Sequence, residues 1–143
     1  MTTTTHLDIL DRSVEKANIW VNEVAAEMGT ADRHDAYRAL RAFLHTLRDR
    51  LPIVESAQLS AQLPLLIRGV FYEGWQPGRT PLRYRDPKEF LDRVSHEAGF
   101  HGDTEASLAV AAVTRVLNRH VSAGEMEDIA RTLPDGLRRL MIA

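Results

Sequence analysis

Cysteine is absent from the 143-residue sequence. Its absence excludes disulfide bonds, thiolate metal ligands and thiol nucleophiles together. Long apolar runs are missing as well, since no stretch approaches the roughly 20 residues that a membrane-spanning helix needs. The first ten residues, MTTTTHLDIL, lack a basic segment followed by an apolar one, so no secretory signal is visible. We therefore expect a cytoplasmic protein with no membrane partner.

An excess of positive charge is also missing. The sequence has 18 lysines and arginines against 20 aspartates and glutamates, and its pI is near 6.3. A dedicated nucleic-acid binder generally carries a basic face. A helix-turn-helix interpretation of residues 55–69 is not favoured, because the helix after Pro64 offers mainly leucine, with Arg68 as its one basic residue. We expect no nucleic-acid partner.

The motifs of common enzyme classes do not occur. The eight glycines are scattered singly, so the sequence has no glycine-rich phosphate loop, and it has no G-x-S-x-G nucleophile motif. We assign no catalytic residue and no cofactor from the sequence. The pattern favours a binding protein over an enzyme.

The sequence does contain an internal repeat. Residues 51–69, LPIVESAQLSAQLPLLIRG, match residues 121–139, VSAGEMEDIARTLPDGLRR, at an offset of 70 positions without a gap. Glu55 aligns with Glu125 in this match, and the Leu-Pro pair at 63–64 aligns with the pair at 133–134. The register extends further back, so residues 20–70 and 90–140 resemble two copies of one unit.

Apolar residues in both copies recur at three- and four-residue steps, which is the spacing of one helix face. This spacing predicts a helix over residues 7–28, with Leu10, Val14 and Val24 on one face, and another over residues 33–51. Prolines then delimit two shorter helices, and no stretch alternates at the two-residue period of a strand. The predicted fold is all-α, with about eight helices in two tandem, pseudo-equivalent four-helix units.

The predicted first unit covers residues 1–74 and the second covers residues 88–143. Residues 75–87 form a connector that is rich in proline and arginine and has no helical pattern. The sequence leaves open whether the two units form separate lobes or merge into one compact domain.

The segments FLDRVSHEAGF and GEMEDIARTLPDGLRRL, separated by an alanine-rich helix, resemble the bacterial family named domain of unknown function 2267. In the first copy, LPIVESAQLSAQLPLLIRG followed by VFYEGWQP resembles the same pattern. The resemblance covers roughly residues 20–140 and implies a small, all-helical, cytoplasmic bacterial protein. It implies no reaction and transfers no catalytic residue. The second copy departs from the pattern at Arg131-Thr132, where the first has Ala61-Gln62.

Three side chains near one predicted helix end are candidates for a metal site. His96, His101 and Asp103 lie within eight residues, and imidazole and carboxylate are competent ligands. The equivalent positions of the first copy hold two alanines and an arginine, so the unit folds without these groups. We interpret them as surface residues and assign no metal ligand.

The carboxylates after residue 122 have a structural interpretation. Ser122 and Glu125 have the spacing of a capping box, in which the hydroxyl accepts from the Glu125 N–H and the carboxylate accepts from the Ser122 N–H. Glu125, Glu127 and Asp128 also complement the positive end of a helix dipole. They need no catalytic explanation.

The polar side of the helix predicted over residues 33–51 is expected to face solvent. It includes Arg48, and it places His45 and Asp49 one turn apart, which is the spacing of an ordinary surface pair.

The connector is the candidate interaction surface. It gathers Trp75, Arg79, Arg83, Tyr84 and Arg85, and these residue types dominate the hot spots of protein interfaces. In the alternative interpretation, Trp75 fills the seam between the units and the arginines pair with local acids.

Two functional classes remain open. The first is a non-catalytic protein-interaction or regulatory module, which contacts a protein partner or a second copy of itself. Its contact surface is the connector or the apolar fourth helix of each unit, residues 65–70 and 137–141. The second class is a small-ligand-binding protein or an unrecognised enzyme, with a site between the two units near the connector.

Overall fold

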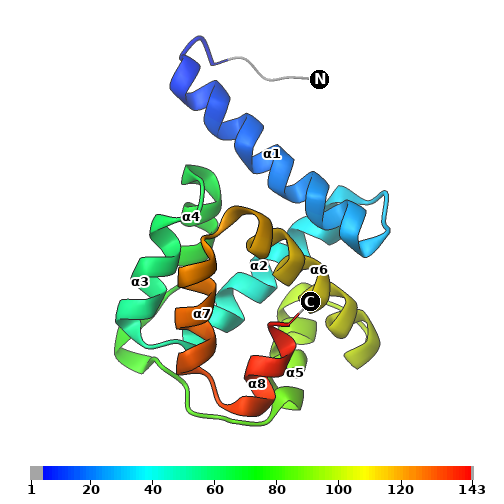
Figure 1. Cartoon of the computed structure of the whole chain (residues 1–143). Helices are drawn as coiled ribbons and strands as arrows, with labels where there is room; N and C mark the ends of the chain where they lie inside the picture. Colours follow the sequence, from blue (N-terminus) through cyan, green and yellow to red (C-terminus); the bar gives the residue numbers. More distant parts are fainter. Residues whose placement is uncertain (1–4, 143) are drawn as a thin grey trace.

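The computed structural model describes residues 5–142 of the chain. Within this range it contains eight α-helices, one short 3₁₀ turn and no strand (Figure 1), which confirms the all-α prediction. The helices are α1 (Asp8–Met28), α2 (Arg33–Arg50), α3 (Ile53–Ala61), α4 (Leu65–Tyr72), α5 (Pro87–Ala98), α6 (Asp103–His120), α7 (Ala123–Thr132) and α8 (Asp135–Leu140), and the turn is η1 (Pro77–Arg79).

The helix bounds repeat at the offset found in the sequence. The 18-residue helices α2 and α6 begin and end 70 positions apart, and α5 matches the last twelve residues of α1. Helices α1 and α5 both stop at a glycine in the left-handed conformation, Gly29 with φ 71° and Gly99 with φ 75°. A side chain at either position would be strained, so the glycines explain where both helices end.

An equivalent arginine closes the short helix in each copy. Arg68 donates from Nε to the Ser60 carbonyl at 2.8 Å and from Nη2 to the Leu63 carbonyl at 2.9 Å. Arg138 makes the same two bonds 70 positions later, at 2.9 and 3.1 Å. Each guanidinium supplies donors to carbonyls that a helix end leaves without an N–H partner. The local structure therefore repeats with the sequence, while the grouping of helices into two units stays a prediction.

The buried side chains form one continuous core drawn from both copies. Helix α2 packs against α1, α5 and α6, and α6 packs against α1 and α5. The rings of Phe43 and Phe90, from α2 and α5, meet edge to face with centroids 5.9 Å apart. Both rings are fully buried, so a residue from each copy lies at the centre of the same core.

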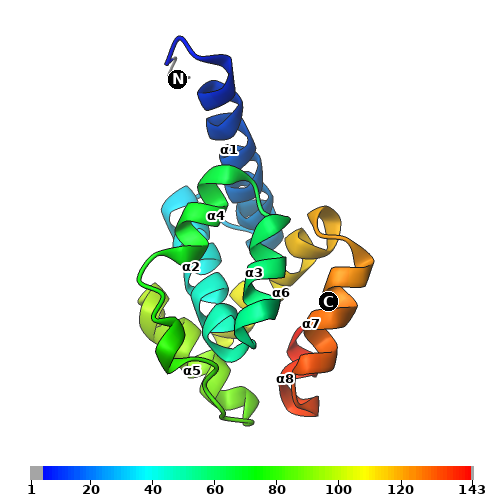
Figure 2. The same cartoon turned by 90° about the vertical axis from the view of Figure 1, so that its left-hand side faces the viewer.

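Helix α1 is nine residues longer than α5, and its N-terminal half extends away from the rest of the molecule (Figures 1 and 2). The apolar stripe predicted for this helix therefore meets two environments. Val24 is fully buried in the core, whereas Leu10 on the projecting half is 42% exposed.

Part of the polar side of α2 is buried, contrary to the sequence prediction. Arg48 is only 4% exposed. Its Nη1 donates to the carbonyls of Phe71 and Glu73 at the end of α4, each at 2.8 Å, and its Nε pairs with Asp49 at 2.8 Å. The end of a buried helix requires donors for its last carbonyls, and a neighbouring guanidinium provides them.

His45 is buried beside Arg48, and the predicted surface pair with Asp49 is wrong. Its Nε2 lies 2.6 Å from the Val70 carbonyl, and its Nδ1 lies 2.9 Å from the Glu97 carboxylate. A single histidine thus joins α2 to α4 in the first copy and to α5 in the second.

Arg48→Ala should lower the free energy of unfolding by about 2–4 kcal/mol, because it leaves the carbonyls of Phe71 and Glu73 and the carboxylate of Asp49 without their donor. Arg38→Ala is the matched control, since Arg38 is exposed on the same helix and pairs with Asp35 alone. The control should change stability by less than about 0.5 kcal/mol. Urea unfolding followed by circular dichroism measures both. Equal losses in the two variants would contradict the role given to Arg48.

Candidate functional site

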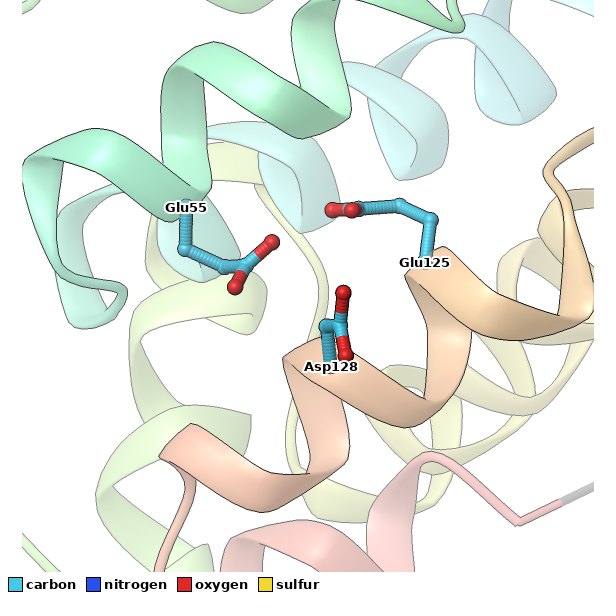
Figure 3. A group of neighbouring side chains, drawn as sticks. All are labelled: Glu55, Glu125 and Asp128. Carbon is cyan, nitrogen blue, oxygen red and sulfur yellow. The ribbon is translucent and has the colours of Figure 1, made fainter.

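Helices α3 and α7, which are equivalent in the two copies, pack against each other. Three carboxylates lie between them: Glu55 projects from α3, and Glu125 and Asp128 project from α7 (Figure 3). One oxygen from each carboxylate lies within 4.8 Å of the others. We call these three residues the acidic cluster. Glu55 and Glu125 are equivalent residues, so the α3–α7 contact brings the same position of both copies together.

The start of α7 explains why Glu125 points towards α3. The Ser122 hydroxyl accepts from the Glu125 N–H at 3.2 Å, which confirms one half of the predicted capping box. The other half is wrong, because the Ser122 N–H donates to Gln62 Oε1 at 2.7 Å. The amide of Gln62, from the end of α3, takes the acceptor role that was assigned to Glu125. The Glu125 carboxylate is left free to turn towards Glu55.

The acidic cluster is poorly compensated in charge. Glu125 is 6% exposed, and Glu55 and Asp128 are half-buried. The Oε2 atoms of Glu55 and Glu125 are buried and have no hydrogen-bond partner in the described part of the chain. Burial raises the pKa of Glu125 to about 8, and the adjacent Glu55 carboxylate and the charge of Asp128 act in the same direction.

Two chemical states can relieve the repulsion between the carboxylates of the acidic cluster. A proton on Glu125 converts one carboxylate into a donor for its neighbour, as in other close carboxyl pairs. Alternatively, with all three groups ionised, the cluster presents only oxygen acceptors, which is the ligand set of hard cations.

The aromatic residues of the connector pack against neighbouring side chains. The guanidinium groups of Arg50 and Arg93 both lie over the Tyr84 ring, at 5.7 and 5.2 Å from its centroid. Burial raises the pKa of the Tyr84 hydroxyl. Trp75 is half-buried and packs on Tyr72, with ring centroids 5.3 Å apart. Both rings therefore help to hold the connector on the helices.

The connector arginines remain exposed. Arg79, Arg83 and Arg85 form no ion pair with any residue in 5–142. Arg79 lines a pocket of about 190 Å³ beside Asp49 and Gly74. The interaction role of the connector stays a prediction.

The three side chains considered as metal ligands do not come together in the structure. His96, His101 and Asp103 are exposed, and Asp103 lies 3.9 Å from Lys88. Among residues 5–142, the group of three or more His, Cys, Asp or Glu side chains whose ligand atoms lie close together is the acidic cluster. The internal repeat aligns Glu55 with Glu125, but alignment does not imply that two residues lie close together. They meet because α3 packs against α7, and no local pattern in the sequence predicts that contact.

A second feature lies on α1 and α4. We define the α1–α4 face by four exposed apolar residues, Leu10 and Ile19 on α1 and Leu65 and Leu66 on α4. A pocket of about 850 Å³ lies on one side of α1 and is lined by Ile19 and Leu65, among others. A second pocket, of about 450 Å³, is lined by residues of α1, α2 and α4, including Leu66. Helix α1 is therefore flanked by a groove on each side.

The fourth helices of the two copies differ in how far they expose their apolar side chains. Leu65 and Leu66 of α4 are exposed, whereas Leu137 and Met141 at the end of the second copy are buried. Only the fourth helix of the first copy presents large apolar side chains to solvent.

The chain matches the family model described as "Uncharacterized conserved protein (DUF2267)" over residues 17–140. This range covers most of the chain, so the protein belongs to that family, as the sequence motifs indicated. The family description assigns no activity. No curated protein matches the chain. Within residues 5–142, none of the helices combines the length and the apolar composition that crossing a bilayer requires.

The acidic cluster predicts a specific dependence of stability on pH. The folded protein keeps a proton on Glu125 up to about pH 8, whereas the unfolded chain releases it near 4.5. The folded state binds more protons between these values, so the free energy of unfolding should fall as pH rises through this range. Glu125→Gln stays neutral and should weaken this decline, leaving the variant more stable than wild type at about pH 9.

Urea unfolding at several pH values, with a chelator present, measures this effect. Glu127→Gln is the control, because Glu127 is exposed on the same helix and should keep the wild-type profile. Parallel profiles for wild type and Glu125→Gln would show that Glu125 holds no additional proton in the fold.

Proposed function

We propose that the chain is a non-catalytic protein-interaction module of the bacterial cytoplasm, and that a second copy of the chain binds to its α1–α4 face. The observation that supports this proposal is the concentration of exposed apolar side chains around the two grooves beside α1. Single exposed apolar residues are ordinary, but several of them around grooves on one projecting helix and its neighbour are typical of an interaction surface.

The α1–α4 face combines a projecting helix with grooves that can receive one. The nine residues by which α1 exceeds α5 extend about 14 Å as a helix. They offer an apolar edge that includes Leu10, and the grooves beside α4 can accept such an edge. Two copies related by a twofold axis would therefore each supply a helix and receive one, as an isologous dimer requires.

The charges on the projecting half of α1 favour an antiparallel arrangement. Asp8 and Asp11 lie in its first turn, and Arg12 and Lys16 follow. Antiparallel pairing of two such helices brings the acidic turn of one copy towards the basic residues of the other. Complementary charges of this kind orient an interface more than they strengthen it.

The runner-up function is a small-ligand binder with a site between the two copies. A pocket of about 610 Å³ between α2 and α5 supports it, and His45, Asp49 and Glu97 are among its lining residues. These helices belong to different copies, as the sequence-based alternative requires.

The wild-type protein should be a dimer in native mass spectrometry and in light scattering at micromolar concentration. Replacing both Leu10 and Leu66 by serine should weaken the dimer at least about tenfold, because both side chains lose apolar contact area. Leu108→Ser is the control, since Leu108 is 59% exposed on α6 and lines neither groove.

A monomer at all concentrations would overturn the proposal, and so would a dimer that survives the double substitution unchanged. A monomer that carries a reproducible small added mass would favour the ligand-binding alternative.

A further inference from the structure

We propose that Glu55, Glu125 and Asp128 form a binding site for one hard divalent cation of the size of Ca²⁺, which links α3 to α7. This site is separate from the α1–α4 face, and neither proposal depends on the other.

The first supporting observation is the convergence of the three groups. Their carboxylates point towards one another from two helices whose residues 55 and 125 are 70 positions apart (Figure 3). Acidic side chains on an ordinary surface point away from one another into solvent, because like charges repel. Here the backbone holds them within 4.8 Å.

The second observation is independent of the clustering. Glu125 is 6% exposed, and its carboxylate points into the cluster (Figure 3). The Oε2 atom of this carboxylate has no hydrogen-bond partner among the described residues. Glu55 Oε2 is buried and unpartnered in the same way. Buried polar atoms in native folds are nearly always satisfied, so two orphaned oxygens facing one space require either the shared proton described above or a bound cation.

The missing partner carries positive charge. Within residues 5–142, neither Glu55 nor Glu125 forms an ion pair, and Asp128 pairs only with the exposed Arg131. One guanidinium at the edge thus faces three carboxylates. A divalent cation would offset the two charges that remain, and it would do so at the centre of the group.

The ligand atoms determine the class of cation. All three are carboxylate oxygens, which suit Ca²⁺, Mg²⁺ and Mn²⁺, and the cluster has no imidazole or thiolate to favour zinc or copper. Ligands on opposite sides of Ca²⁺ can lie up to about 5.2 Å apart, whereas those of Mg²⁺ lie at most about 4.2 Å apart. The spread within 4.8 Å lies inside the larger span of Ca²⁺ ligands, so we assign the site to a cation of the size of Ca²⁺.

The site is open enough for exchange with solvent. Glu55 and Asp128 are half-buried, so water can reach the cation and complete the six to eight ligands that Ca²⁺ takes. The equivalent of Asp128 in the first copy is Gln58, so the two copies contribute three carboxylates rather than four. With three carboxylates, the α3–α7 contact has ligands for one cation.

Isothermal titration of the chelator-treated full chain with CaCl₂ tests the proposal, with MgCl₂ as a second titrant. We expect one saturable Ca²⁺ site per chain, weaker binding of Mg²⁺, and a higher melting temperature with Ca²⁺. Glu125→Gln and Asp128→Asn should each weaken Ca²⁺ binding at least about tenfold. Glu127→Gln should bind as wild type does.

Three results would overturn the proposal. The first is the absence of saturable binding to wild type, and the second is unchanged binding in both Glu125→Gln and Asp128→Asn. The third is Mg²⁺ binding tighter than Ca²⁺, which would remove the size assignment. Asp128 is half-buried, so Asp128→Asn keeps the test valid if the Glu125 variant folds poorly, and circular dichroism checks the fold of each variant.

Discussion

The packing of α2 and α6 into one shared core is the constraint on which the rest of the structure depends. Both helices bury three alanines at equivalent positions, Ala36, Ala39 and Ala42 in α2 and Ala106, Ala109 and Ala112 in α6. Small side chains on a helix face allow close approach of a neighbouring helix. Only two residues separate α2 from α3, and two separate α6 from α7. Once α2 and α6 share a core, these short connections bring α3 and α7 together, and the meeting of Glu55 with Glu125 follows.

The two copies differ in the residues and helix lengths around this shared core. In α2, Arg48 provides donors to the end of α4, and the equivalent residue of α6 is Asn118, which has no guanidinium to offer α8. Helix α8 has six residues and α4 has eight. The first copy also has the longer first helix, whose projecting half and neighbouring α4 expose apolar residues. The first copy thus supplies the surface proposed for self-association, and the second supplies two of the three carboxylates.

Much of the fold could be predicted from the sequence, because it is encoded locally. Glycines in the left-handed conformation and prolines delimit the helices, and the 70-residue offset reappears in the helix bounds. The acidic cluster could not be predicted in the same way, because it depends on how equivalent helices pack. The capping box was half wrong because Gln62, distant in sequence, bonds to the Ser122 N–H. The helical pattern predicts that His45 and Arg48 face solvent, and this prediction was wrong. Both side chains are buried because they bond to main-chain carbonyls of α4.

Equivalent glutamates of the two copies, Glu55 and Glu125, face each other across the α3–α7 contact. A double-mutant cycle of Glu55→Gln and Glu125→Gln, measured by urea unfolding at about pH 9 in the presence of a chelator, tests this arrangement most directly. If the carboxylates repel each other, either substitution removes the repulsion, and the double variant gains less than the sum of the two by at least about 0.5 kcal/mol. Additive effects would mean that the two glutamates do not interact, and would contradict both the α3–α7 contact and the cation site built on it.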